Sequence, residues 1–235
     1  MMPDVCDNPV PAVICCCGLG ENLEKCQRDF AEKAVESGAA VFCFDFYGGC
    51  VNSRSGGEMT EMSVFTEMND LRTVICGLSD RSELDANQLF LMGESQGGFV
   101  AGAVAPEYAD RIRGLLLYYP GFCIPEMAGI AYESEDEVPD RFTVAGWEVG
   151  KKYFQGIFGY PVYQVIRGYK GPVLIFHGEN DEIVDISYSM RAANAYENAK
   201  LITLPWEGHG FSPAGNRKAA EFSCRFIREH CFNRG

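Results

Sequence analysis

The feature that most constrains this chain is a Gly-x-Ser-x-Gly motif between an apolar run and a run of small residues. Residues 89–92 are apolar, residues 93–97 read Gly-Glu-Ser-Gln-Gly, and small and apolar residues fill 98–104. This order predicts a strand, a sharp turn and a helix, with Ser95 strained and exposed at the tip of the turn. The positive N-terminal end of that helix would point beside Ser95. We therefore expect Ser95 to act as a nucleophile.

Length and composition indicate one globular domain, residues 1–235, without a nucleic-acid or membrane partner. The chain has 235 residues, of which 47% are hydrophobic and 23% are charged, and its formal charge is −13. No block of Lys or Arg stands out, which argues against nucleic acid and anionic membranes. No apolar run is long enough to span a bilayer, and the N-terminus does not read as a signal peptide. We expect a cytoplasmic protein, and a homodimer is left open.

The sequence contains eleven cysteines but no Cys-x-x-Cys spacing. Three of them are consecutive at 15–17, on an expected strand where neighbouring side chains point to opposite faces. We expect reduced and mostly buried thiols. The spacing and the three histidines argue against a zinc site, so no metal and no cofactor are expected.

Short apolar runs alternate with helical patterns, which predicts an α/β fold with a mostly parallel sheet covered on both faces. Strands are expected at 10–17, 40–45, 88–92, 114–118, 172–177 and 199–204. Helices are expected at 22–38, 62–78, 96–105, 187–198 and 214–232. Residues 121–166 interrupt the alternation with an acidic loop followed by many aromatics. A loop this long is usually functional, so we expect a small helical cap there.

A serine hydroxyl needs a base, and the chain offers His177, His209 and His230. His209 lies in a glycine-flanked loop beyond the last expected strand, where an open α/β sheet gathers its catalytic groups. His177 ends a strand and His230 lies near the end of the last helix. We expect His209 to be the base.

The base in turn needs a carboxylate that fixes its tautomer. Asp181 follows the strand that ends at His177, and Glu179, Glu182 and Asp185 are its competitors nearby. With Asp181 the chain order is Ser, Asp, His, the order of α/β-hydrolases. For the oxyanion we expect two backbone donors, the N–H of Gln96 and the N–H of Leu19 in the loop after the first strand.

Together these motifs resemble the α/β-hydrolase superfamily, and within it small bacterial esterases of the cinnamoyl (feruloyl) type. The matching segments span nearly the whole chain and read Gly-Leu-Gly-Glu-Asn (18–22), Phe-Asp-Phe-Tyr-Gly (44–48), Gly-Glu-Ser-Gln-Gly-Gly (93–98), Phe-His-Gly-Glu-Asn-Asp (176–181) and Gly-His-Gly-Phe (208–211). The cap matches more loosely. In such esterases a cap tyrosine and an acidic residue hold the phenolic end of the acyl group, and the resemblance implies Tyr153 and Glu126 for these roles.

The chain departs from that family in two places. Cys17 stands where the family usually has a histidine before the oxyanion glycine, and only about nine residues precede Val10. The β-hairpin that usually opens the fold is therefore expected to be missing or reduced.

The function expected from the sequence is a serine carboxylic-ester hydrolase that forms an acyl-enzyme. Its substrate is expected to be a small-molecule ester with an aromatic (hydroxycinnamoyl) or short-to-medium acyl group. A serine peptidase or a thioesterase could use the same triad. A non-catalytic ligand-binding relative is a further alternative.

Overall fold

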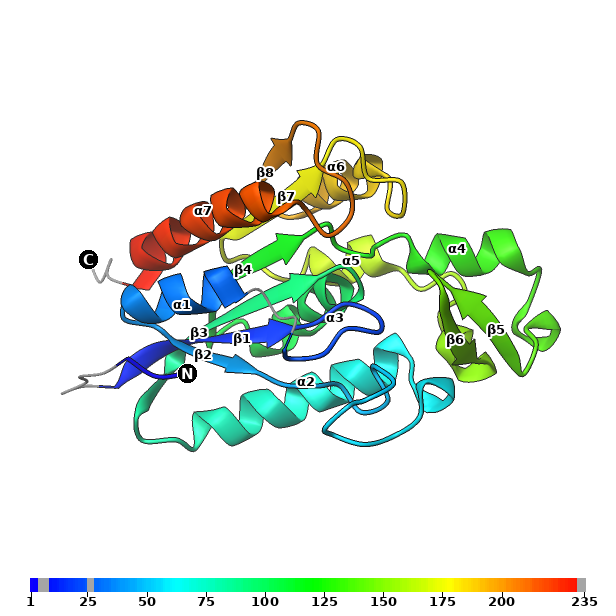
Figure 1. Cartoon of the computed structure of the whole chain (residues 1–235), viewed down its shortest axis with the longest axis horizontal. Helices are drawn as coiled ribbons and strands as arrows, with labels where there is room; N and C mark the ends of the chain where they lie inside the picture. The colour runs from blue at the N-terminus through cyan, green and yellow to red at the C-terminus, as the bar shows by residue number, and fades with distance from the viewer. Residues whose placement is uncertain (4–8, 25–27, 232–235) are drawn as a thin grey trace.

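The computed structural model describes residues 1–3, 9–24 and 28–231, and its centre is a six-stranded sheet (Figure 1). The strands are ordered β2-β1-β3-β4-β7-β8, and every pair in this sheet is parallel. Their bounds are β1 Val10–Cys16, β2 Ala40–Cys43, β3 Leu84–Glu94, β4 Ile112–Tyr118, β7 Val173–Gly178 and β8 Ala199–Leu204. The chain has the α/β-hydrolase fold, and in its described part no antiparallel strand joins this sheet.

Alternation along the strands places a core on each face of the sheet. Ile14, Leu91 and Leu117 face one core, and their neighbours Val13 and Met92 face the other. The first core is covered by α2 Val64–Ser79, α3 Gln96–Val104, α5 Val162–Ile166 and α6 Ile186–Ala195. The second core is covered by α1 Arg28–Glu36 and α7 Pro213–Cys231 (Figure 1). Because both faces are buried, the strands are apolar throughout.

Most of the segment 121–166, the cap, lies at the end of the molecule opposite the two termini, whereas α5 at its end packs in the first core (Figure 1). Besides α4 Ile124–Ala131 and α5 the segment contains an antiparallel hairpin, β5 Arg141–Val144 and β6 Trp147–Gly150. The hairpin was not expected from the sequence. Its turn is Ala145-Gly146, both at positive φ, and alanine is an unusual residue in a turn that normally takes Asn-Gly.

Strand β3 begins at Leu84 and not at the expected Gln88. After Leu84 the strand continues with the mostly polar residues 85–88 (Asp-Ala-Asn-Gln), and its register with β1 shifts between Val10 and Ala12. This irregular start has no apolar alternation and was therefore not visible in the sequence.

The nine cysteines described are free thiols, seven of them buried; Cys6 and Cys26 lie outside the described residues. In that same part of the chain, no helix has the length and apolar character needed to cross a membrane. Cys17 is 2% exposed and packs in the core under α1 and α7.

Candidate active site

Sheet order brings the loops that carry the expected site together. Cys16 pairs with Gly93, so the loop after β1 lies beside the turn after β3. Gly178 pairs with Leu204, which places the loops after β7 and β8 side by side. In the sheet, β2 lies on one side of β1 and β3 lies on the other, so the strand order reverses at β1. Ligands bind at such switch points of α/β sheets.

Ser95 occupies the sharp turn between β3 and α3. Its φ is 50° and its ψ is −119°, a strained conformation for a residue with a side chain. A Cβ on Gly93 would stand 2.4 Å from the Gly97 carbonyl oxygen, and one on Gly97 would stand 2.2 Å from that of Cys16. Only glycine fits at both positions, which is why the turn needs this motif.

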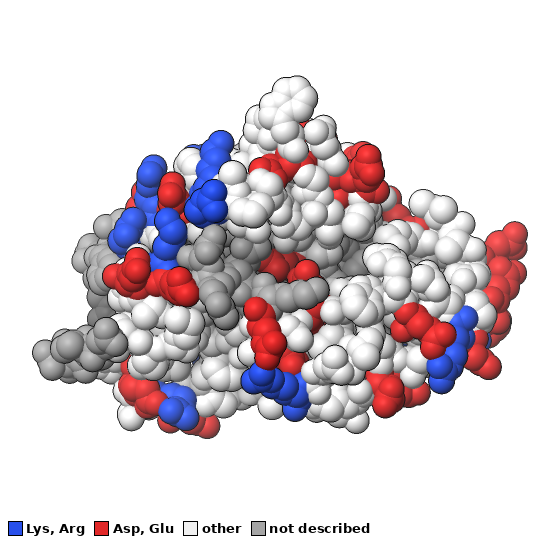
Figure 2. Space-filling view, in the orientation of Figure 1, with Lys and Arg blue, Asp and Glu red and all other residues white. Residues whose placement is uncertain are grey.

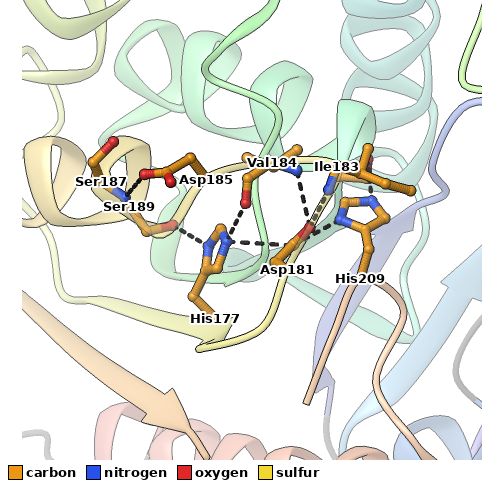
Figure 3. Close-up of polar contacts among 9 residues, drawn as sticks. His177, Asp181, Ile183, Val184, Asp185, Ser187, Ser189 and His209 are labelled. Atoms are coloured by element: carbon orange, nitrogen blue, oxygen red, sulfur yellow. Dashed lines mark hydrogen bonds and ion pairs between the residues drawn. The ribbon is translucent and has the colours of Figure 1, made fainter. Parts of the chain in front are cut away.

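Ser95, His209 and Asp181 form one continuous hydrogen-bonded chain. Ser95 Oγ lies 2.9 Å from His209 Nε2, and His209 Nδ1 lies 2.8 Å from Asp181 Oδ2. The other carboxylate oxygen of Asp181 accepts from the backbone N–H groups of Ile183 and Val184, each at 2.9 Å (Figure 3). With Asp181 on Nδ1, the imidazole presents Nε2 to the serine hydroxyl as an acceptor.

The carboxylate of Asp181 has no exposed surface. Burial would raise its pKa, but the hydrogen bonds from His177, His209 and the Val184 N–H outweigh burial and hold that pKa well below its usual range. The structure therefore keeps a negative charge behind His209.

His177 is a second histidine on Asp181, which the sequence reasoning did not assign. Its Nε2 lies 2.8 Å from the Val184 carbonyl oxygen and 3.3 Å from Asp181 Oδ2, while Nδ1 lies 2.7 Å from Ser189 Oγ (Figure 3). A carbonyl only accepts, so the neutral ring carries its proton on Nε2 and accepts from Ser189. The four-residue spacing from His177 to Asp181 was the available signal.

The other sequence candidates lie away from Ser95. His230 Nδ1 faces the Phe226 carbonyl at 2.7 Å. Glu179 accepts from Thr203, Asp185 caps α6 at Ser187 N, and Glu182 is exposed.

Leu19 and Gln96 both line the cavity at Ser95, and their backbone N–H groups are the expected oxyanion donors. Neither donates a hydrogen bond to another group in the described part of the chain. Free donors next to a nucleophile can receive a developing oxyanion.

The cavity has a volume of about 510 Å³ and lies between the sheet and the cap. Tyr153 lines it, but its hydroxyl donates to Gln96 Oε1 at 2.7 Å. Glu126 does not line it: its carboxylate is held by Tyr188 and Arg191 at 2.9 and 2.5 Å. The structure thus does not bring the expected Tyr153–Glu126 pair together. The lining of the cavity also includes residues 18, 21, 119, 121, 123, 124, 127, 144, 145, 147, 183, 184 and 210.

Comparisons with known proteins agree with this architecture. A family model described as serine aminopeptidase, S33, matches residues 7–149. The solved structure of Est1E from Butyrivibrio proteoclasticus with ferulic acid bound is similar, with a TM-score of 0.88 and 24% identity over 98% of this chain and 93% of that one. A monoacylglycerol lipase from Paleococcus ferrophilus has a TM-score of 0.78 and 18% identity over 95% of this chain and 97% of its own. No curated protein matched the sequence.

Proposed function

We propose that this chain, which belongs to the serine aminopeptidase S33 family of α/β-hydrolases, is a serine carboxylic-ester hydrolase that works through an acyl-enzyme. The observation that carries the proposal is the unbroken contact from Ser95 Oγ through His209 to Asp181. Ser95 attacks the ester carbonyl as His209 Nε2 takes its proton, and the N–H groups of Leu19 and Gln96 receive the oxyanion. His209 then gives the proton to the leaving alcohol. Water activated by the same ring releases the acid.

We propose small esters with an aromatic or a short-to-medium acyl group as substrates. A cavity of about 510 Å³ matches the size of small-molecule sites. Apolar side chains, among them Ile124, Met127 and Val144, border it, and Tyr153 adds an aromatic ring. The similar Est1E structure contains ferulic acid, which is an aromatic acid of the kind this cavity could hold.

The test of the mechanism is Ser95→Ala. Hydrolysis of p-nitrophenyl butyrate and methyl ferulate should fall by at least about 10³-fold, while thermal unfolding stays close to that of the parent protein. The parent should also be labelled by a fluorophosphonate, and the variant should not. Retained hydrolysis in Ser95→Ala would refute this mechanism.

A serine peptidase is the second candidate, because the family description names an aminopeptidase. Fold and triad do not separate the two activities. Rates on alanine p-nitroanilide and on alanine p-nitrophenyl ester, measured side by side, distinguish them. An esterase should turn over the ester and leave the anilide intact.

A further inference from the structure

One carboxylate faces the reaction cavity. Among the described residues that line it, Glu21 is the one acidic side chain, and none is lysine or arginine. In the space-filling view, acidic atoms are also visible near the middle of the face shown (Figure 2). A cavity of this kind repels anionic substrates and attracts cationic ones.

Glu21 also lies close to the nucleophile. Its Oε2 atom and the Cβ of Ser95 each lie 3.3 Å from the point where a Cβ on Gly18 would stand, so the two atoms are at most twice that distance apart. Burial raises the pKa of Tyr119, and the charges of Glu94 and Glu21 raise it further. The charge of the Glu21 carboxylate therefore acts on both Ser95 and Tyr119.

This carboxylate has no partner in the described part of the protein. Its side chain makes no hydrogen bond or ion pair there, whereas Glu24, three residues later, pairs with Arg54. An unpaired negative charge this close to Ser95 opposes the oxyanion that forms when the serine attacks. A positive charge brought by the substrate would remove that repulsion.

An aromatic ring lies over the same loop. A Cβ on Gly20 would stand only 2.1 Å from the Trp147 ring, so the indole from β6 packs directly on the loop that carries Glu21. Trp147 and Glu21 both border the cavity. A carboxylate and an indole that border one cavity suit an alkylammonium group, which is attracted by the negative charge and by an aromatic ring face.

We propose that Glu21 and Trp147 form a subsite for an ammonium group of the substrate, an inference that rests on the proposed ester hydrolysis. The preferred esters carry a cationic group a few bonds from the scissile carbonyl. That group belongs to the alcohol portion, as in choline esters, or to the acyl portion, as in amino-acid esters.

Two matched pairs of esters test the subsite and tell the portions apart. Choline butyrate is compared with its neutral isostere 3,3-dimethylbutyl butyrate. Ethyl 4-(trimethylammonio)butanoate is compared with ethyl 5,5-dimethylhexanoate. In at least one pair the cation should have a kcat/KM about tenfold higher at low salt, and 1 M NaCl should shrink that ratio.

The variant that tests the residue is Glu21→Gln. It should bring the ratio of cationic to neutral kcat/KM close to one. The cationic ester becomes slower because its ammonium group loses its partner, and the neutral ester becomes faster because a repulsive charge next to its oxyanion is gone. Glu24→Gln is the matched control and should keep the parent's ratio, because Glu24 is exposed and paired with Arg54. Ratios near one in the parent, or an unchanged ratio in Glu21→Gln, overturn the subsite.

Failure of the proposed function is distinguishable from failure of the subsite. Absence of both p-nitrophenyl butyrate hydrolysis and fluorophosphonate labelling refutes the esterase. If p-nitrophenyl butyrate is hydrolysed but none of the four esters is, inhibition by choline and by 3,3-dimethylbutanol decides. Stronger inhibition by choline that is lost in Glu21→Gln supports the subsite, and equal inhibition overturns it.

Discussion

Two of the buried carboxyl groups around Ser95 and Gln96, those of Asp181 and Glu67, differ in charge. Asp181 reaches Ser95 through His209, and its pKa is held well below the usual range. Glu67, on α2, lies near Gln96, the residue after Ser95. Burial raises the pKa of Glu67 to about 8; the nearby Gln96 amide lowers it only in part, and the charge of Asp70 adds to the rise.

Both carboxyl groups are buried, and they differ in how many hydrogen-bond donors offset the effect of burial. Asp181 receives two backbone N–H groups and two imidazoles. Within the part of the chain that the structure describes, Glu67 Oε2 has no hydrogen-bond partner, nor has Gln96 Nε2. A buried carboxyl with too few donors to offset burial keeps its proton to a higher pH. The arrangement puts a negative charge behind His209, where the proposed mechanism would form an imidazolium, and a neutral group behind Gln96, where it would form an oxyanion.

The largest expected effect comes from replacing the charged carboxylate of Asp181 with a neutral amide. Asp181→Asn should lower kcat for p-nitrophenyl butyrate about 10⁴-fold, because an amide can donate to His209 Nδ1 and leave the proton on Nε2, facing Ser95. Steady-state kinetics measure the loss. Asp185→Asn is the control, since Asp185 caps α6 and does not contact His209. A decrease of less than tenfold for Asp181→Asn would mean that another group orients His209.

The protonation of Glu67 is tested by the pH dependence of the free energy of unfolding. The unfolded chain loses this proton near the ordinary pKa of 4.5, whereas the folded protein keeps it up to about 8. Between these values folding takes up a proton, so the Glu67 contribution to stability falls as pH rises and is fully lost above pH 8. Glu67→Gln removes this dependence, and its gain over the parent should grow from pH 5 to pH 8 to a few kcal/mol.

Urea unfolding at several pH values measures that gain. Glu61→Gln, at an exposed glutamate in the short helix Met59–Glu61 before α2, is the control and should follow the parent at every pH. Parallel stability curves for Glu67→Gln and the parent would show that Glu67 is ionised in the folded protein, and the contrast with Asp181 would disappear.

The sequence predicted the Asp181 side far better than the Glu67 side, for a physical reason. Ser95 is recognisable because the sharp turn between β3 and α3 requires glycine at 93 and 97. A backbone constraint of this kind determines the residues directly next to it in the sequence. Asp181 and His209 follow the ends of strands, which parallel pairing brings to one edge of the sheet. Local patterns and strand order were therefore enough to place these three residues together.

Glu67 and the cap depend on contacts that no local pattern reveals. Glu67 looks like any helical glutamate until α2 packs against α3 and buries it. The hairpin β5–β6 has a turn with alanine at positive φ, and Glu126 was matched to a substrate role although Arg191 and Tyr188 hold it. Distant segments decide these placements, so the sequence left them open.

The smallest expected effect comes from Tyr153, whose hydroxyl donates to Gln96 Oε1. Burial raises the pKa of this tyrosine, so the group stays a donor. Tyr153→Phe leaves a buried acceptor without a partner and should cost about 1–3 kcal/mol of stability in urea unfolding. It should lower kcat/KM for methyl ferulate and for p-nitrophenyl butyrate by the same small factor. Tyr132→Phe is the control, because that cap hydroxyl makes no hydrogen bond among the described residues. A loss confined to methyl ferulate would instead indicate that the Tyr153 hydroxyl leaves Gln96 to bind the phenolic end of the acyl group, and that the polar cluster around Gln96 rearranges when substrate enters.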